Sequence, residues 1–86
     1  MLEIDRHLGL RIEEARQLRG LSQAELADVI EADVATIAAM ETGQVRIASI
    51  VLARIARELD LPLSWFFDGL PGQDVFDAPQ RQRRLV

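Results

Sequence analysis

The sequence contains no cysteine, lysine or tyrosine, and His7 is its one histidine. Without cysteine the chain has no disulfide, no thiolate metal ligand and no cysteine nucleophile. One histidine on the exposed side of a predicted first helix does not make a metal site. No serine has a histidine or lysine partner at a spacing that indicates catalysis. We therefore expect no metal, no cofactor and no enzymatic activity.

Long apolar runs are also absent, and none approaches the ~20 residues that a membrane-spanning helix needs. The N-terminus carries Glu3, Asp5 and Arg6 in place of the apolar block of a secretory signal. These features predict a soluble, cytoplasmic protein with no membrane partner. No sensor segment is evident, so no small-molecule ligand is expected.

Basic side chains are missing from one segment, although the net charge of the whole chain is only −4. Residues 22–45 contain no base, whereas the segments on either side hold similar numbers of arginines and acids. The acids of this segment are Glu25, Asp28, Glu31, Asp33 and Glu41. Because acidic side chains repel phosphate, this segment disfavours nucleic-acid binding.

Apolar residues recur at helical spacing through most of the chain, and no pattern indicates a strand. The spacing predicts five helices, over about residues 5–19, 23–30, 34–42, 49–59 and 63–68. Gly20 is expected to end the first helix. Ser22 and Glu25 are spaced as a capping box for the second, and Asp33 as the N-cap of the third. The prediction is an all-α, compact five-helix bundle.

The helical pattern ends after Gly69. Residues 1–70 are therefore predicted to form one domain, and residues 71–86 a flexible C-terminal tail. Val75 and Phe76 lie in this tail and are candidates for packing back onto the bundle.

Residues 8–69 resemble the Cro/repressor-type (Xre-type) helix-turn-helix family. The resemblance is carried by LGLRIEEARQLRGLSQAELA (8–27), METG (40–43) and LARIARELDLPLSWFFDG (52–69). The chain is similar to stand-alone alphaproteobacterial members of this family. The resemblance implies a lambda-repressor-like DNA-binding domain, and a sequence-specific transcriptional regulator that binds double-stranded DNA as a homodimer. It also implies that Glu41 points inward, to backbone or to an arginine of the first helix such as Arg16 or Arg19.

Carried over by position, the family's DNA contacts fall on a mixed set of side chains. They are Ser22, Gln23, Val34, Ala35, Thr36, Ala39, Gln44 and Arg46. The family's usual pattern differs at two places. Glu31 stands where the turn between the second and third helices usually has glycine, and the outward positions of the third helix are apolar rather than polar or basic.

The apolar third helix leaves two interpretations open. Val34, Ala35 and Ala39 can contact thymine methyl groups in a DNA groove. The same face also suits a protein partner, since exposed apolar patches often mark protein-binding sites. In that case the chain would be a co-regulator, anti-regulator or antitoxin-like module.

The aromatic triplet Trp65, Phe66 and Phe67 is the other candidate contact. We expect two of its side chains to close the core and the segment to supply a dimer or partner edge.

Overall fold

Five α-helices make up most of residues 2–70, which is the part of the chain that the computed structural model describes. They are α1 (Glu3–Leu18), α2 (Gln23–Val29), α3 (Val34–Glu41), α4 (Ser49–Glu58) and α5 (Leu63–Phe67). This range contains no strand, so the predicted all-α class is confirmed. Helix α1 begins at Glu3, earlier than predicted, and the acids Glu3 and Asp5 in its first turn favour that start. The predicted tail lies outside the described residues.

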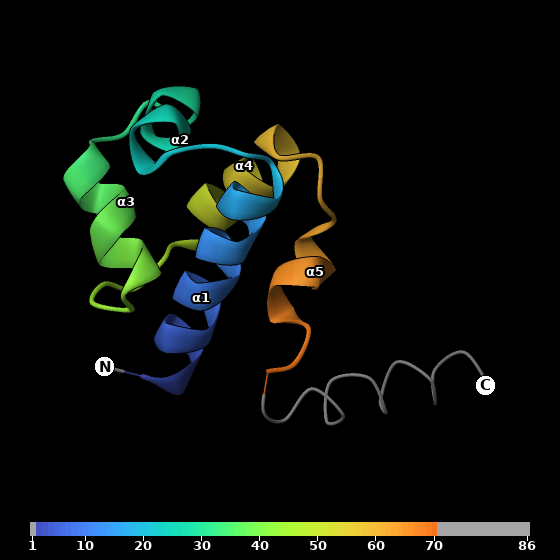
Figure 1. The fold of residues 1–86 in the computed structure, drawn as a ribbon. Coiled ribbons are helices and arrows are strands. Elements are labelled where there is room, and N and C mark those ends of the chain that lie inside the picture. Colours follow the sequence, from blue (N-terminus) through green and yellow to red (C-terminus); the bar gives the residue numbers. More distant parts are fainter. Residues whose placement is uncertain (1, 71–86) are drawn as a thin grey trace.

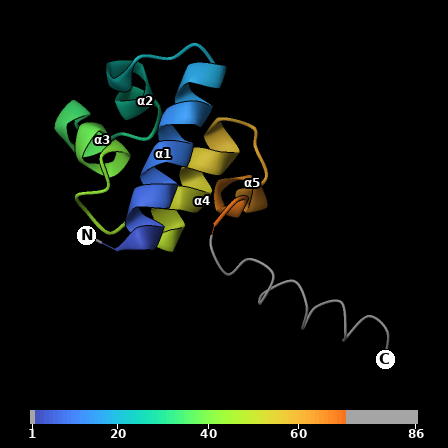
Figure 2. The same cartoon turned by 60° about the horizontal axis from the view of Figure 1, so that its bottom comes forward.

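Helix α1 runs through the middle of the bundle, with α2 and α3 on one side and α4 and α5 on the other (Figures 1 and 2). Its buried side chains include Leu8, Ile12 and Ala15, which recur at helical spacing. At Gly9 the backbone of α1 comes close to α3. A β-carbon there would clash with the carbonyl oxygen of Met40 and lie 2.9 Å from that of Glu41, so glycine permits this close crossing.

The core receives at least one fully buried side chain from every helix. These side chains are Ile12, Leu26, Ile37, Leu52, Ile55 and Phe66. Phe66 has no exposed area, so it is one of the aromatic side chains that close the core. Trp65 and Phe67 are half-buried and pack against the core. His7 is half-buried rather than exposed, and its Nε2 lies 3.1 Å from the Phe66 carbonyl oxygen.

The turns around α2 set the position of the helix-turn-helix unit. The predicted capping box is present: the Glu25 N–H donates to Ser22 Oγ at 3.0 Å, and the Ser22 N–H donates to Glu25 Oε1 at 2.8 Å. Asp33 occupies the predicted N-cap position of α3, but its side chain makes no capping hydrogen bond. Glu31 has φ 58°, so the turn does require the left-handed conformation that glycine adopts most easily. Within residues 2–70, no helix is long and apolar enough to cross a membrane.

Candidate nucleic-acid interface

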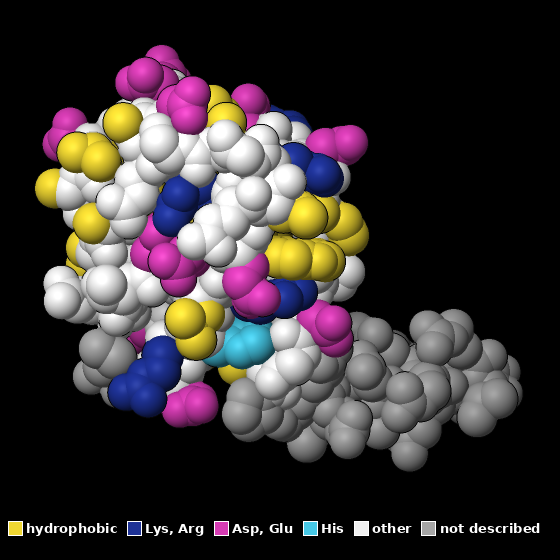
Figure 3. Space-filling view, in the orientation of Figure 1, with side chains coloured by type: hydrophobic (Ala, Val, Ile, Leu, Met, Phe, Trp, Pro, Cys, Tyr) yellow, Lys and Arg dark blue, Asp and Glu magenta, His cyan; other side chains and the backbone are white. Residues whose placement is uncertain are grey.

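Helix α3 has one buried side and one exposed, largely apolar side. Ile37, Met40 and Glu41 face the core, whereas Val34 is 49% exposed and Ala35 is also exposed. Ala39 is half-buried. Figure 3 shows hydrophobic side chains gathered over the α3 side of the molecule and acidic side chains along the edge formed by α2. The inward residues therefore place α3 as the fold requires, and the unusual residues are confined to its outer side.

The start of α2 is fixed beside the end of α3 by a hydrogen bond between their side chains. Gln23 Nε2 donates to Glu41 Oε1 at 2.9 Å, and Gln23 is half-buried. Its neighbour Ser22 is exposed. We call the exposed side of α3, together with Ser22, Gln23 and the segment 44–46, the α2–α3 surface.

Glu41 is held from the other direction by Arg16 of α1. Arg16 Nε donates to Glu41 Oε2 at 2.7 Å, an Arg16 terminal nitrogen donates to Oε1 at 3.2 Å, and the other donates to the Leu21 carbonyl at 2.8 Å. The expected inward pairing of Glu41 is thus confirmed with Arg16, while Arg19 donates to the Leu59 carbonyl instead. The hydrogen bond with Glu41 raises the pKa of Arg16 above its ordinary value, although burial opposes the shift. Arg16 therefore stays charged at every ordinary pH.

A second acid of residues 22–45 is also paired with an arginine from elsewhere in the chain. Arg54 of α4 donates to Glu31 Oε1 at 2.7 Å. This hydrogen bond and the charge of Arg54 lower the pKa of Glu31 below 4.5. The acidic charge counted along the sequence therefore overstates the repulsion at this surface, because α1 and α4 neutralise Glu41 and Glu31. Sequence spacing gave no signal for either partner beyond the family resemblance for Arg16.

Gln44 and Arg46 lie exposed in the segment between α3 and α4. The Arg46 side chain is 67% exposed, and its Nε donates to Asp5 Oδ1 at 3.1 Å. Asp5 belongs to the start of α1 and its side chain is only 9% exposed. Among residues 2–70, Asp5 is the only side chain that bonds Arg46, and it does so through Nε. The terminal nitrogens of Arg46 therefore remain available to a ligand. Asp5 was missed from the sequence because it stands 41 positions from Arg46.

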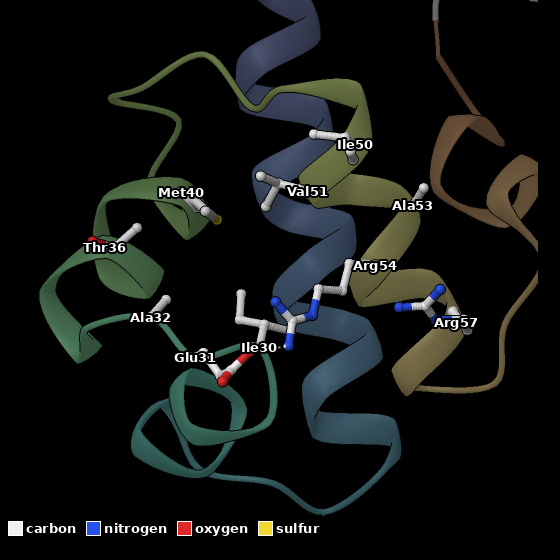
Figure 4. A pocket seen from close by; sticks show the side chains of 10 residues that line it. All are labelled: Ile30, Glu31, Ala32, Thr36, Met40, Ile50, Val51, Ala53, Arg54 and Arg57. Carbon is white, nitrogen blue, oxygen red and sulfur yellow. Dashed lines mark hydrogen bonds and ion pairs between the residues drawn. The ribbon is translucent and has the colours of Figure 1, made fainter.

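Thr36 lies on the border between α3 and α4. It lines a concavity of about 670 Å³ between α3 and α4, together with Met40, Val51 and Arg54 (Figure 4). Although Thr36 is exposed, it lies on the side of α3 that faces α4. The structure thus brings Gln23 to the end of α3 and places Thr36 at the edge of the α2–α3 surface.

Comparison with known proteins agrees with this arrangement. The model of a family described as helix-turn-helix matches residues 12–66. Two uncharacterized HTH-type transcriptional regulators, from Sinorhizobium medicae and Rhizobium meliloti, are each 35% identical to the chain over 76 residues. The matches cover 88% of this chain and 55% of each relative, so the chain spans about half the length of these relatives.

Solved structures of two regulators share the fold. The restriction-modification controller protein C.AhdI from Aeromonas hydrophila is 29% identical, with a TM-score of 0.68 over 72% of this chain and 94% of the other. The clp gene regulator ClgR from Corynebacterium glutamicum has a TM-score of 0.75 over 96% of this chain and 88% of the other. ClgR is 20% identical, so it supports the fold alone. The helix-turn-helix fold expected from the sequence is confirmed.

Proposed function

Because the chain belongs to the helix-turn-helix family of Xre-type transcriptional regulators, we propose that it binds specific sequences of double-stranded DNA through the α2–α3 surface. In helix-turn-helix proteins the second helix of the unit enters the major groove and the first crosses the phosphate backbone. Here the first helix of the unit is α2 and the second, which would enter the groove, is α3. The observation that carries the proposal is the fixed position of Gln23, which Glu41 and Arg16 hold beside the end of α3.

The side chains of this surface suggest a division of roles. Val34, Ala35 and Ala39 suit contacts with thymine methyl groups, because they have no polar atoms to bond to base edges. Gln23 and Arg46 suit contacts with the phosphate backbone. Arg46 bonds Asp5 through its Nε, and its two terminal nitrogens have no partner within residues 2–70. Few basic side chains lie near this surface. Few counterions would therefore be released on binding, and the affinity should depend weakly on salt.

The test is a fluorescence-anisotropy titration against DNA fragments from the promoter region of the protein's own gene. We expect Gln23→Ala to weaken binding about tenfold, the equivalent of ~1.4 kcal/mol. Arg46→Ala should reduce the slope of log affinity against log salt by about 0.9, the value for one lost phosphate contact. Gln17→Ala on α1 and Arg57→Ala on α4 are matched controls, since both residues are exposed outside the α2–α3 surface. Binding that ignores Gln23→Ala and Arg46→Ala would contradict this site.

We further propose that the protein binds DNA as a homodimer whose contact includes Trp65 and Leu63 of α5. Leu63 is 44% exposed, and Trp65 is held in place because Arg11 donates to its carbonyl and lies 3.5 Å over its ring. Sedimentation velocity tests the contact. Leu63→Glu should give a monomer, whereas Ile50→Glu, at a 79% exposed position of α4, should leave the dimer intact. The reverse pattern would move the interface to α4.

The exposed apolar side of α3 supports a second candidate, a protein partner that covers Val34 and Ala35 in place of DNA. No base lies in residues 22–45, and Val34 is half exposed. A partner that copurifies in equal amount and is lost with Ala35→Glu would favour this function, provided that the protein alone binds no DNA. Specific DNA binding without any such partner would reject it.

A further inference from the structure

A groove lies where the start of α1, the segment after α3 and the end of α5 meet. It has a volume of about 260 Å³, and its walls include Leu2, Ile4, Ile47 and Phe67, with Asp5 and Arg46 beside them. Leu2 is 50% exposed and Ile4 is 37% exposed. The groove therefore leaves apolar side chains in contact with water next to one accessible arginine.

We propose that residues 74–77 of the same chain, Asp-Val-Phe-Asp, bind in this groove. Val75 and Phe76 would cover Leu2 and Ile4, and a carboxylate of the segment would bind Arg46. The occupant is a stretch of two apolar residues with an acid on either side, and the groove offers apolar walls beside an arginine.

The position of the groove along the chain favours this segment as its occupant. Phe67 forms part of the wall, and the described residues end at Leu70, three positions later. Pro71 and Gly72 follow at once, a dipeptide typical of a chain reversal. The six steps from Leu70 to Phe76 span at most about 22 Å, which is ample for a return to a groove bounded by α5.

The larger concavity between α3 and α4 is a less suitable binding site for the same segment. In both ribbon views α3 and α5 lie on opposite sides of α1 and α4 (Figures 1 and 2). A segment that leaves the end of α5 would have to pass around the bundle to reach it.

Charge also matches between the groove and residues 74–77. Arg46 already neutralises Asp5 through its Nε, at 3.1 Å, so an incoming carboxylate does not meet an unpaired acid there. The terminal nitrogens of Arg46 have no partner among the described residues. A carboxylate from Asp74 or Asp77 would therefore form a charge-assisted hydrogen bond with them.

Binding of the segment would regulate the proposed DNA contact, a consequence that rests on the function proposed above. Arg46 cannot bind a phosphate while an aspartate occupies its terminal nitrogens. Bound residues 74–77 would therefore compete with DNA, and their release would restore Arg46 to the α2–α3 surface.

Nuclear magnetic resonance of the full chain tests the binding of the segment without DNA. We expect nuclear Overhauser contacts between the Phe76 ring and the methyl groups of Leu2 and Ile4, independent of protein concentration. Phe76→Ala should shift these methyl resonances, whereas Leu85→Ala, which removes an apolar side chain elsewhere in residues 71–86, should leave them unchanged. Absence of the contacts would overturn the proposal. Contacts found only between differently labelled molecules would also overturn it, because a second copy would then fill the groove.

DNA titration of the same variants tests the competition. If the segment is bound in roughly 70–90% of molecules, Phe76→Ala should lower the dissociation constant about three- to tenfold relative to Leu85→Ala. Unchanged affinity alongside the ring contacts would overturn the competition. Ring contacts in a protein that binds no DNA in any variant would support the bound segment and reject the proposed function.

Discussion

Replacing Glu41 with alanine should strongly destabilise the protein, because it breaks a buried ion pair. The Glu41 side chain is 3% exposed, and that of its partner Arg16 is 12% exposed. Glu41→Ala would leave the Arg16 guanidinium nearly buried without its main carboxylate, and would also remove the acceptor for Gln23 Nε2. Breaking a buried ion pair by removing one partner typically costs about 3–5 kcal/mol.

The structure places the expected loss at the lower end of that range. Arg16 would keep its hydrogen bond to the Leu21 carbonyl, at 2.8 Å, and a longer contact to Glu13, at 4.0 Å. We therefore expect a loss of about 3 kcal/mol. For a domain of this size that corresponds to a fall of roughly 12–24 °C in Tm.

Urea unfolding followed by circular dichroism measures the loss, with Glu31→Ala as the control. Glu31 also bonds an arginine at 2.7 Å, but its side chain is 79% exposed, so water replaces the lost partner and little stability should be lost. The double variant Arg16→Ala, Glu41→Ala should cost less than the sum of the two single changes. Equal losses for Glu41→Ala and Glu31→Ala would refute the reasoning that burial gives the first pair its importance.

Three further predictions concern backbone contact, capping and pH. Gly9→Ala should lower the free energy of unfolding by about 3 kcal/mol or more, because the new β-carbon would clash with the Met40 carbonyl oxygen and meet that of Glu41 at 2.9 Å; a urea midpoint equal to wild type would disprove that close crossing. Ser22→Ala should cost about 1 kcal/mol through the lost cap, and a melting curve unchanged from wild type would show that the cap contributes nothing. Because Arg54 lowers the pKa of Glu31, their pair contributes stability above pH 4.5 that disappears as pH falls through the lowered pKa. Glu31→Gln should thus be less stable than wild type near neutral pH and converge with it in acid, and a constant difference at all pH values would contradict this pairing.

The helices could be predicted from the sequence because their signals are local. The capping box of Ser22 and Glu25 depends on two residues three positions apart, and the structure contains it as expected. The burial of Phe66 was harder to predict, since three adjacent aromatic residues on a short helix give no periodicity that separates the core member from its neighbours. Asp33 shows the same limit: the residue type indicated the cap position but not the absence of its hydrogen bond.

The electrostatics of the site could not be predicted from segment composition. Residues 22–45 contain no base, yet Arg16 and Arg54 reach Glu41 and Glu31 from α1 and α4. Such partners are set by how helices pack, so a charge count along the chain misses them. The family resemblance anticipated the Arg16 pairing because it carries information about packing that composition lacks.

The proposed function depends on contact between the exposed side of α3 and DNA. Ala35 and Ala53 are both exposed alanines within helices, on α3 and α4 respectively, so glutamate at either changes the net charge equally. The most direct test is an anisotropy titration of the two variants against a promoter fragment that the unmodified protein binds. We expect Ala35→Glu to weaken binding at least about tenfold, roughly 1.4 kcal/mol, and Ala53→Glu to change it far less. Equal weakening by both variants would contradict this expectation, because the effect would then come from net charge and not from contact at α3.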